Sequence, residues 1–448
     1  MYMEILRAAL GVSFFVAVAW ALSSDRERFP WRIVIGGVGA QIALGLMILK
    51  TDWGFAFFRL LSDGFVRLLE SSRVAGEIVF GRMGAGDPDT DVGYVFAFAG
   101  NGLLAIIFFS ALLAVLYHLG VMQALIWALA RMMTWAFRVS GAESLAMAAN
   151  VFAGQTEAPL VVRPYLSKMT RSELNALMTG GFATVAGSVL AVYASVVGPA
   201  NVHHLLTASV MSAPAAFVIA KVLVPESGVA ATAGHVPFRV ERQHHNVLEA
   251  AAAGTSDGLK LWLNVIAMLI AFAALVHLLN WPLGALGVAA FGMDEGELSV
   301  QSLLGWVFAP VAWLIGVAWE DCRRFGTLLG IKIAVNEVIA FLEMGKTAVA
   351  AAAAETPQAA DAVAGPAAGL DPIGEQATTL GFTHARSAQM AFYALCGFAN
   401  FASIGIQIGG IASLVPERRT DLAKLALKAM IGGACASWMT ASIAGGML

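Results

Sequence analysis

The stretch AGQTEAPLVV, residues 153–162, puts a carboxamide, a hydroxyl and a carboxylate side by side in an apolar part of the chain. These groups belong to Gln155, Thr156 and Glu157, and apolar residues precede and follow them. A similar interruption occurs in IAVNEVIAF, residues 333–341, where Asn336 and Glu337 stand together. If such stretches lie within a membrane, their ionisable groups must face protein or a water-filled cavity, because lipid cannot solvate them.

The composition is that of an integral membrane protein. Of the 448 residues, 59% are hydrophobic and 13% are charged, against about 25% charged residues in a soluble domain. The mean hydropathy is +0.76 and the formal net charge is −3, so nothing indicates a nucleic-acid partner. Cys322, Cys396 and Cys435 form no CxxC pair, and we expect them to pack in the interior rather than bind metal or form disulfides.

Apolar runs long enough to cross a bilayer predict eight transmembrane spans. The first run ends in SSDRERFP rather than in small residues, so we interpret it as a retained helix and not as a signal peptide. Residues 51–72 place apolar side chains at spacings of three and four, which predicts an amphipathic helix lying in the membrane interface. The predicted spans are residues 4–22, 31–49, 95–118, 174–198, 203–224, 258–281, 386–413 and 420–446.

Two further segments, residues 141–166 and 326–349, are too interrupted for ordinary spans and predict re-entrant helical hairpins with Glu157 and Glu337 at their tips. The order span, Trp-containing amphipathic segment, hairpin, Gly-interrupted span and plain span occurs twice, over residues 95–224 and 258–446. Corresponding interrupted segments in two halves indicate the binding site of a transporter.

The remaining polar segments are predicted to be loops without chemistry. Residues 349–375 are rich in alanine, glycine and proline and predict a mobile loop, and residues 225–246 are similar. Two His-His pairs, at 203–204 and 244–245, lie in or beside loops, and we expect solvated histidines rather than a metal site.

The two buried glutamates have two interpretations. A charge at the membrane centre costs roughly 2.5 to 3.5 kcal/mol, so each glutamate must have a structural or functional role that offsets this cost. They could be structural carboxylates that cap broken helices, or they could belong to a cluster of donors and acceptors for a polyhydroxylated or heterocyclic solute, which we favour. The interrupted spans FATVAGSVL, residues 182–190, and GFANFASIGI, residues 397–406, add glycines and hydroxyls where unwinding would free backbone groups for a ligand or an ion.

Four motifs, in order, resemble the signatures of the concentrative nucleoside transporter family: GQTEAPLVVRPYL at 154–166, ATVAGSVLAVY at 183–193, the NE of VNEVIAF at 336–337, and ALCGFANFASIGIQIGG at 394–410. The long Ala-rich insert before His384 departs from that family's pattern but lies outside the motifs. The resemblance implies an all-α membrane protein of the bacterial, sodium-coupled type, with eight spans, two re-entrant hairpins, interfacial amphipathic helices and an internal repeat. It also implies a homotrimer in the bacterial inner membrane.

The resemblance also implies a site, position by position. The first hairpin tip and its broken span would hold the nucleobase, and the second hairpin and its broken span would hold the ribose. A coupling sodium ion would lie between the first hairpin and its broken span. The implied positions are Gln155, Thr156, Glu157 and Val189 for the base; Glu337, Phe398, Asn400 and Ser403 for the ribose; and Asn150, Thr184 and the carbonyls of Ala153 and Val185 for sodium.

These observations predict a secondary active transporter that imports nucleosides with a cation gradient. Proton coupling is the alternative to sodium. A membrane-embedded enzyme with Glu157 and Glu337 as an acid/base pair is disfavoured, because no nucleophile, metal-ligand set or nucleotide loop accompanies them, and a channel is disfavoured because nothing suggests a filter ring. We expect scaffold parts at residues 1–137 and 247–320 and transport parts at 138–225 and 325–448.

Overall fold

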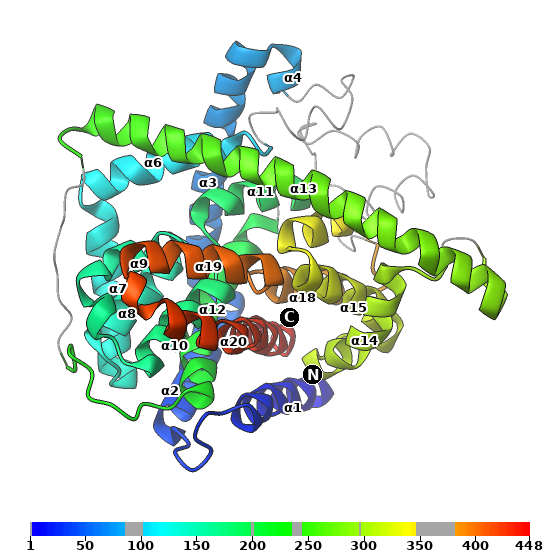
Figure 1. The fold of residues 1–448 in the computed structure, drawn as a ribbon, viewed down its shortest axis with the longest axis horizontal. Helices are drawn as coiled ribbons and strands as arrows, with labels where there is room; N and C mark the ends of the chain where they lie inside the picture. Colours follow the sequence, from blue (N-terminus) through cyan, green and yellow to red (C-terminus); the bar gives the residue numbers. More distant parts are fainter. Residues whose placement is uncertain (1, 86–101, 199–200, 235–243, 295–296, 346–380) are drawn as a thin grey trace.

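The computed structural model describes residues 2–85, 102–198, 201–234, 244–294, 297–345 and 381–448, and within these ranges every regular element is a helix (Figure 1). The all-α prediction is therefore confirmed. The predicted mobile loop at 349–375 lies outside the described residues, as does part of the loop at 225–246.

The chain begins with two apolar helices followed by a long amphipathic one. Helices α1 (Tyr2–Ala21) and α2 (Trp31–Lys50) correspond to the first two predicted spans. Helix α3 (Asp52–Phe80) starts where Thr51 accepts a hydrogen bond from the Gly54 amide, and it extends beyond the predicted amphipathic segment. The short helix α4 (Arg82–Ala85) follows it.

Five helices are long and apolar enough to cross a membrane, or up to seven if two bent pairs each count as one span. One bent pair joins α6 (Ala105–His118) to α7 (Val121–Phe137) at 76°, and the other joins α14 (Val300–Ile315) to α15 (Trp319–Ala334) at 117°. The predicted span at 95–118 is described only from residue 102 onward. Each of the eight predicted runs nevertheless contains a helix or a pair of helices in the described residues.

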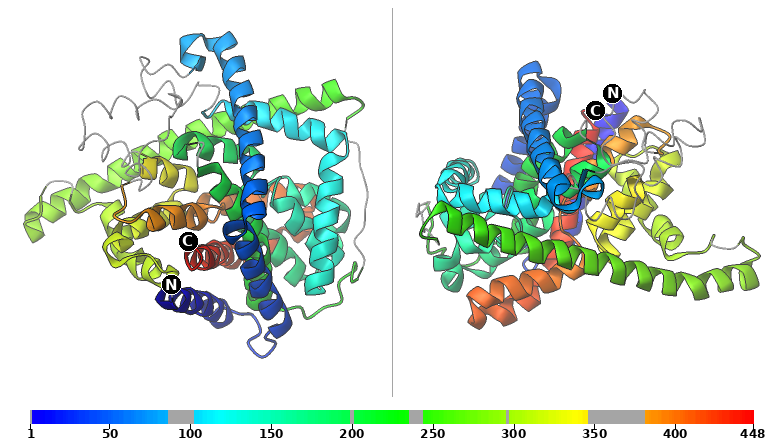
Figure 2. Two further views of the ribbon diagram at one scale, coloured as in Figure 1. Left: turned by 180° about the vertical axis from the view of Figure 1, so that it is seen from behind. Right: turned by 90° about the horizontal axis from the view of Figure 1, so that it is seen from above.

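Helix α13 (Val247–Phe291) is much longer than the span predicted at 258–281. It continues through Pro282 for 45 residues, which is about 67 Å at 1.5 Å per residue. A hydrocarbon core is about 30 Å thick, so α13 must lie obliquely or extend past the membrane. Figures 1 and 2 show it crossing the whole body along α6, with one end projecting beyond the other helices.

The central helices are α10 (Arg171–Ala183), α12 (Val202–Leu223) and α20 (Arg419–Gly445), which pack against one another (Figure 1). Helices α1 and α2 pack on α12 and α20, and α18 (Ala385–Leu395) packs on both as well. The apolar window of the span Arg171–Ala194, which begins with α10, is 94% buried, whereas that of α13 is 0% buried. Polar side chains on the central helices are therefore shielded from lipid by protein.

Both predicted hairpins and both interrupted spans are present. The first hairpin consists of α8 (Gly141–Asn150), a non-helical tip, α9 (Ala158–Val161) and the 3₁₀ helix η1 (Arg163–Lys168). The second consists of α15, a break at Val335 and a helix over residues 337–345. The first interrupted span is α10 with α11 (Gly187–Val197), and the second is α18 with α19 (Phe401–Leu414), which leads through the 3₁₀ helix η4 (Pro416–Arg418) to α20.

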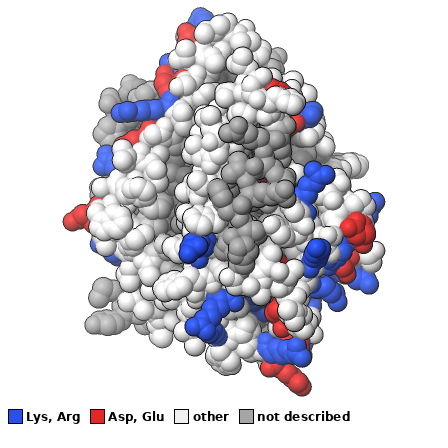
Figure 3. Space-filling model, turned by 90° about the vertical axis from the view of Figure 1, so that its left-hand side faces the viewer, with Lys and Arg blue, Asp and Glu red and all other residues white. Residues whose placement is uncertain are grey.

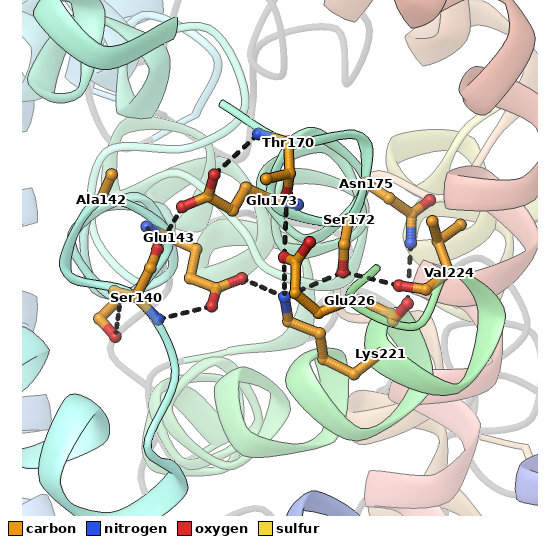
Figure 4. A network of polar contacts seen from close by, with 12 residues as sticks. Ser140, Ala142, Glu143, Thr170, Ser172, Glu173, Asn175, Lys221, Val224 and Glu226 are labelled. Carbon is orange, nitrogen blue, oxygen red and sulfur yellow. Dashed lines mark hydrogen bonds and ion pairs between the residues drawn. The ribbon is translucent and has the colours of Figure 1, made fainter. Parts of the chain in front are cut away.

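A buried ion-pair network that the sequence did not indicate fixes the start of the first hairpin (Figure 4). Lys221, near the end of α12, lies 2.6 Å from the Glu143 carboxylate, and both side chains are at most 3% exposed. The same ammonium donates to Ser172 at 2.9 Å and lies 3.5 Å from Glu226. One lysine thus ties α8 and α10 to α12.

Two capping boxes strengthen this junction. The hydroxyls of Ser140 and Thr170 cap α8 and α10, and Glu143 and Glu173 reciprocate to the backbone amides of the capping residues. The Ser140 hydroxyl also donates to Glu173, which joins the two boxes (Figure 4). The base of the first hairpin is therefore held by paired helix caps, whereas its tip is non-helical.

The prediction that both histidines of the first pair are solvated is wrong for His204. His203 and His204 lie in the first turn of α12, and His204 is 6% exposed with its ring 3.0 Å from the Tyr393 hydroxyl. Sequence placed the pair at a loop boundary but did not show that α18 covers it. The three cysteines are free and buried, as expected.

The outer surface suits a chain surrounded by lipid. On the face drawn in Figure 3, charged side chains gather at the edges and toward the lower end, and broad uncharged areas lie between them. Large apolar side chains of α13, including Leu263, Ile270 and Trp281, are more than half exposed.

Candidate functional site

The second hairpin places Glu337 at the first turn of the helix over residues 337–345. The Asn336 side chain caps this helix by accepting a hydrogen bond from the Ile339 amide at 2.9 Å. Glu337 is 4% exposed, and its two carboxylate oxygens have different partners: Tyr193 donates to one at 2.9 Å and the Asn400 amide donates to the other at 2.8 Å. Tyr193 lies on α11, so this carboxylate joins the two halves of the chain.

The Asn400 side chain makes a second hydrogen bond in addition to the one with Glu337. It is the N-cap of α19, and its side-chain oxygen accepts from the Ser403 amide at 2.8 Å. That bond fixes which end of the Asn400 amide faces Glu337. Glu337, Asn400 and Ser403, three of the four residues expected to hold ribose, therefore form one group, and Phe398 is buried in the break just before Asn400.

Gln155 brings the first hairpin tip to this group. Its amide donates to the Ser403 hydroxyl at 3.1 Å, and its oxygen accepts from Gln407 at 3.2 Å. Gln407 also donates to the carbonyl of Met178 on α10 at 3.1 Å. The side chains of Gln155, Ser403 and Gln407 are all buried. The hydrogen-bonded network therefore runs from one hairpin tip to the other, through both interrupted spans.

The two breaks lie directly against each other. Gly397, in the second break, has a φ of +113°, and a Cβ at this position would lie 2.8 Å from the carbonyl oxygens of Phe182 and Ala183 at the end of α10. Gly154, in the first tip, has a φ of +84°, and its Cβ would lie 2.6 Å from that of Ala186. Both glycines are required by backbone conformation and by close approach.

Thr156 and Glu157 face a different space. Both line a cavity of about 490 Å³ between the first hairpin, α6 and α13, together with Tyr117, Asp257 and Asn264. Thr156 is exposed and Glu157 is half-buried. The structure thus separates them from Gln155, which points into the buried network, while Val189 is buried on α11.

The four positions implied for sodium lie together around the first break. Asn150 and Thr184 are both fully buried, and both approach Gly180: the Thr184 hydroxyl donates to its carbonyl at 2.8 Å, and the Asn150 amide would lie 3.0 Å from a Cβ there. The Asn150 side-chain oxygen is buried without a hydrogen-bond partner. Among the described residues, the carbonyls of Ala153 and Val185 accept no hydrogen bond either. An unpartnered amide oxygen and free backbone carbonyls are ligands of the kind that a hard cation takes.

Two members of the network, Tyr193 and Gln407, were missed in the sequence. Each lies four residues after a position that was singled out, since Tyr193 follows Val189 and Gln407 follows Ser403. Residues four apart share a helix face, so this spacing could have identified both. Asp257, in the cavity, carried no such signal.

Interrupted spans and re-entrant hairpins that enclose a buried polar network define the architecture of a secondary transporter. Comparison with known families agrees: the model of the Na+ dependent nucleoside transporter C-terminus matches residues 204–445, that of the N-terminus matches 10–83, and a nucleoside recognition model matches 102–200. The chain belongs to the family of Na+ dependent nucleoside transporters. The family consists of transporters, so the acid/base pair of an enzyme is not the explanation for Glu157 and Glu337.

Relatives extend over nearly the whole chain. An uncharacterized transporter of Haemophilus influenzae is 40% identical over 444 residues, which cover 99% of this chain and 98% of that protein. Sodium/nucleoside cotransporter 1 of Rattus norvegicus is 38% identical over 453 residues, and this chain spans 64% of its length.

Solved structures of a protein named CNTnw have the same fold. Its inward-facing substrate-bound state gives a TM-score of 0.84 at 34% identity, covering 99% of this chain and 98% of that one. A variant in an outward-facing state gives 0.86 at 36% identity, covering 100% and 98%.

Proposed function

We propose that the chain is a symporter that imports nucleosides with sodium by alternating access. The observation that carries the proposal is the buried network around Glu337, in which a carboxylate and four amides or hydroxyls from both halves converge. A carboxylate oxygen has two acceptor positions. Tyr193 and Asn400 each use one on Glu337, and the carboxylate therefore keeps acceptor capacity for a ribose hydroxyl.

The two groups of polar residues divide the substrate between them. In this proposal Glu337, Asn400 and Ser403 bind the ribose, with Phe398 packing beside it. Gln155, Thr156 and Glu157 bind the base, with Val189 providing apolar contact. Gln155 is bonded to Ser403 in the present conformation, and Thr156 and Glu157 face the adjacent cavity, which supports a base that lies toward α6 and α13.

Sodium is the proposed co-transported ion. The unpartnered oxygen of Asn150, the Thr184 hydroxyl and the carbonyls of Ala153 and Val185 provide only oxygen ligands. The ion would tie the first hairpin to its broken span next to Gln155, so ion binding and substrate binding would favour the same conformation. Proton coupling is the alternative, with a titrating group such as Glu157 in place of the ion.

The scaffold is proposed to form a homotrimer in the bacterial inner membrane. Helix α13 leaves a continuous row of large apolar side chains uncovered, and among the described elements its main neighbour is α6. A second and third copy could cover part of this row, and lipid would cover the rest. The proposed division of the chain is unchanged: scaffold parts at 1–137 and 247–320, and transport parts at 138–225 and 325–448.

The deciding experiment is uptake of labelled uridine and adenosine into proteoliposomes with a sodium gradient, a proton gradient or neither. Accumulation that requires the sodium gradient supports the proposal. Accumulation driven by an acid exterior without sodium would show that protons, and not sodium ions, are co-transported. The proposed nucleoside site would be unaffected by that result. Equilibration without accumulation under any gradient would indicate a channel and contradict the proposal.

A further inference from the structure

Lys332 is a fully buried lysine on the second hairpin whose ammonium group ends among backbone carbonyls. Its side chain is 0% exposed, and its nitrogen donates to the carbonyl of Ala394 at 2.8 Å and to that of Cys396 at 3.3 Å. The Cys396 carbonyl also accepts from the Ser437 hydroxyl of α20 at 2.8 Å. These carbonyls lie where α18 ends, so the ammonium sits at the negative end of that helix.

This arrangement matches, in the second half, the place implied for sodium in the first. Asn150 ends α8, the first arm of the first hairpin, and contacts α10 before its break. Lys332 lies in the last turn of α15, the first arm of the second hairpin, and contacts α18 at its break. Each hairpin therefore sends one polar side chain from the last turn of its first arm to the helix that precedes the interruption.

The charges also correspond. Within the described part of the chain no carboxylate pairs directly with Lys332, but Glu337 is close enough for its charge to act on the ammonium. The charges of Lys332 and Glu337 therefore balance each other in the second hairpin. In the first half, Glu157 stands at the hairpin tip, and the cation would come from solution.

We propose that the Lys332 ammonium is a tethered cation that holds the second hairpin to its broken span, as sodium holds the first, and that it excludes a second ion there. This inference rests on the proposed function. It makes Lys332 a positioning residue for Glu337 and Asn400, because the carbonyls that it binds belong to the break from which Asn400 caps α19.

The test uses proteoliposomes containing the wild type, Lys332→Met, Lys332→Ser and, as a matched control, Lys424→Met, whose lysine is exposed on α20. The wild type and the control should carry one net charge per uridine and show first-order dependence on sodium. Lys332→Met keeps the length of the side chain without the charge. It should raise the uridine KM about tenfold or more, without restoration by saturating sodium, because charge-assisted bonds to the break are lost.

Lys332→Ser leaves space and an oxygen beside the two carbonyls. Its uridine affinity should recover in part at high sodium, with a Hill coefficient above that of the wild type. A wild-type uridine KM in Lys332→Met would overturn the inference, and so would two net charges per uridine in the wild type, a measurement that needs no variant to fold. Sodium-independent uptake by the wild type would instead contradict the sodium coupling in the proposed function and leave the nucleoside site standing.

Discussion

Replacing Glu337 by glutamine tests the ribose site with little disturbance of the fold. Tyr193 donates to one carboxylate oxygen at 2.9 Å and Asn400 to the other at 2.8 Å. Asn400 cannot turn its amide without losing its bond to the Ser403 amide, so the glutamine oxygen must face Asn400. The glutamine nitrogen then faces Tyr193, whose hydroxyl can rotate and accept. The internal network survives with neutral partners.

The effect on the substrate follows from the acceptor positions that remain. The carboxylate offers a ribose hydroxyl a charged acceptor, whereas the glutamine offers at most one neutral acceptor position. A hydrogen bond to a charged group contributes about 1.5 to 3 kcal/mol and a neutral one about 0.5 to 1.5 kcal/mol. Each such bond is therefore weakened by about 1 to 1.5 kcal/mol, and the uridine KM should rise by at least about fivefold.

The assay is sodium-driven uptake of uridine and 2′,3′-dideoxyuridine, with Glu417→Gln as a matched control at an exposed carboxylate. The wild type and the control should prefer uridine strongly, and Glu337→Gln should lose most of that preference because the hydroxyls no longer meet a charge. Size-exclusion profiles of all three proteins should agree. Unchanged uridine uptake by Glu337→Gln, or an undiminished preference for uridine, would refute the reasoning.

Four further outcomes are expected. Uracil should compete for uridine uptake much more weakly than unlabelled uridine, since the ribose group offers most of the buried polar contacts; equal inhibition would contradict this. Thr184→Val should raise the sodium concentration that gives half-maximal uptake. It should also lower the uridine affinity indirectly, and saturating sodium should restore part of that affinity. An unchanged dependence of uptake on sodium would show that Thr184 is not a ligand of the ion. Gly397→Ala should lower the melting temperature and uptake together, because strain of about 1 to 3 kcal/mol adds to the clash with two carbonyls; a fully stable, active variant would show that the breaks need not touch. Lys221→Met should destabilise the detergent-solubilised protein by about 3 to 5 kcal/mol, because it leaves Glu143 buried and unpaired. The double variant with Glu143→Leu should recover much of that loss. Purely additive effects of the two substitutions on stability would contradict this prediction.

Much of the fold was predictable because a membrane imposes strong local rules. Apolar runs of bilayer length and the polar interruptions at Glu157 and Glu337 predicted the helices, both hairpins and both broken spans, which are all present. The length of α13 was not predictable from a window matched to the bilayer, because its apolar and polar segments form one continuous helix.

The candidate site was predicted in part, and the difference has a physical cause. Motif resemblance named Gln155, Glu337, Asn400 and Ser403, which the structure joins in one network, but not Gln407, whose partner Gln155 is 252 positions away. Local sequence determines where a helix breaks and which polar groups the break carries. It does not determine which distant groups those are paired with.

Tertiary packing alone decided the direction of each polar group. Gln155 and Glu157 are two residues apart in the sequence, yet one points into the buried network and the other lines the cavity beside α13. Likewise, the position of Lys332 in an apolar helix gave no sign that its ammonium ends at the carbonyls of the α18 break. The sequence by itself determined a membrane-spanning helical chain with polar breaks in two similar halves, because helix periodicity and hydropathy are local properties. Only the folded structure decided how those breaks meet, because the contacts between them join segments hundreds of residues apart and depend on close approach of backbones that no local pattern encodes.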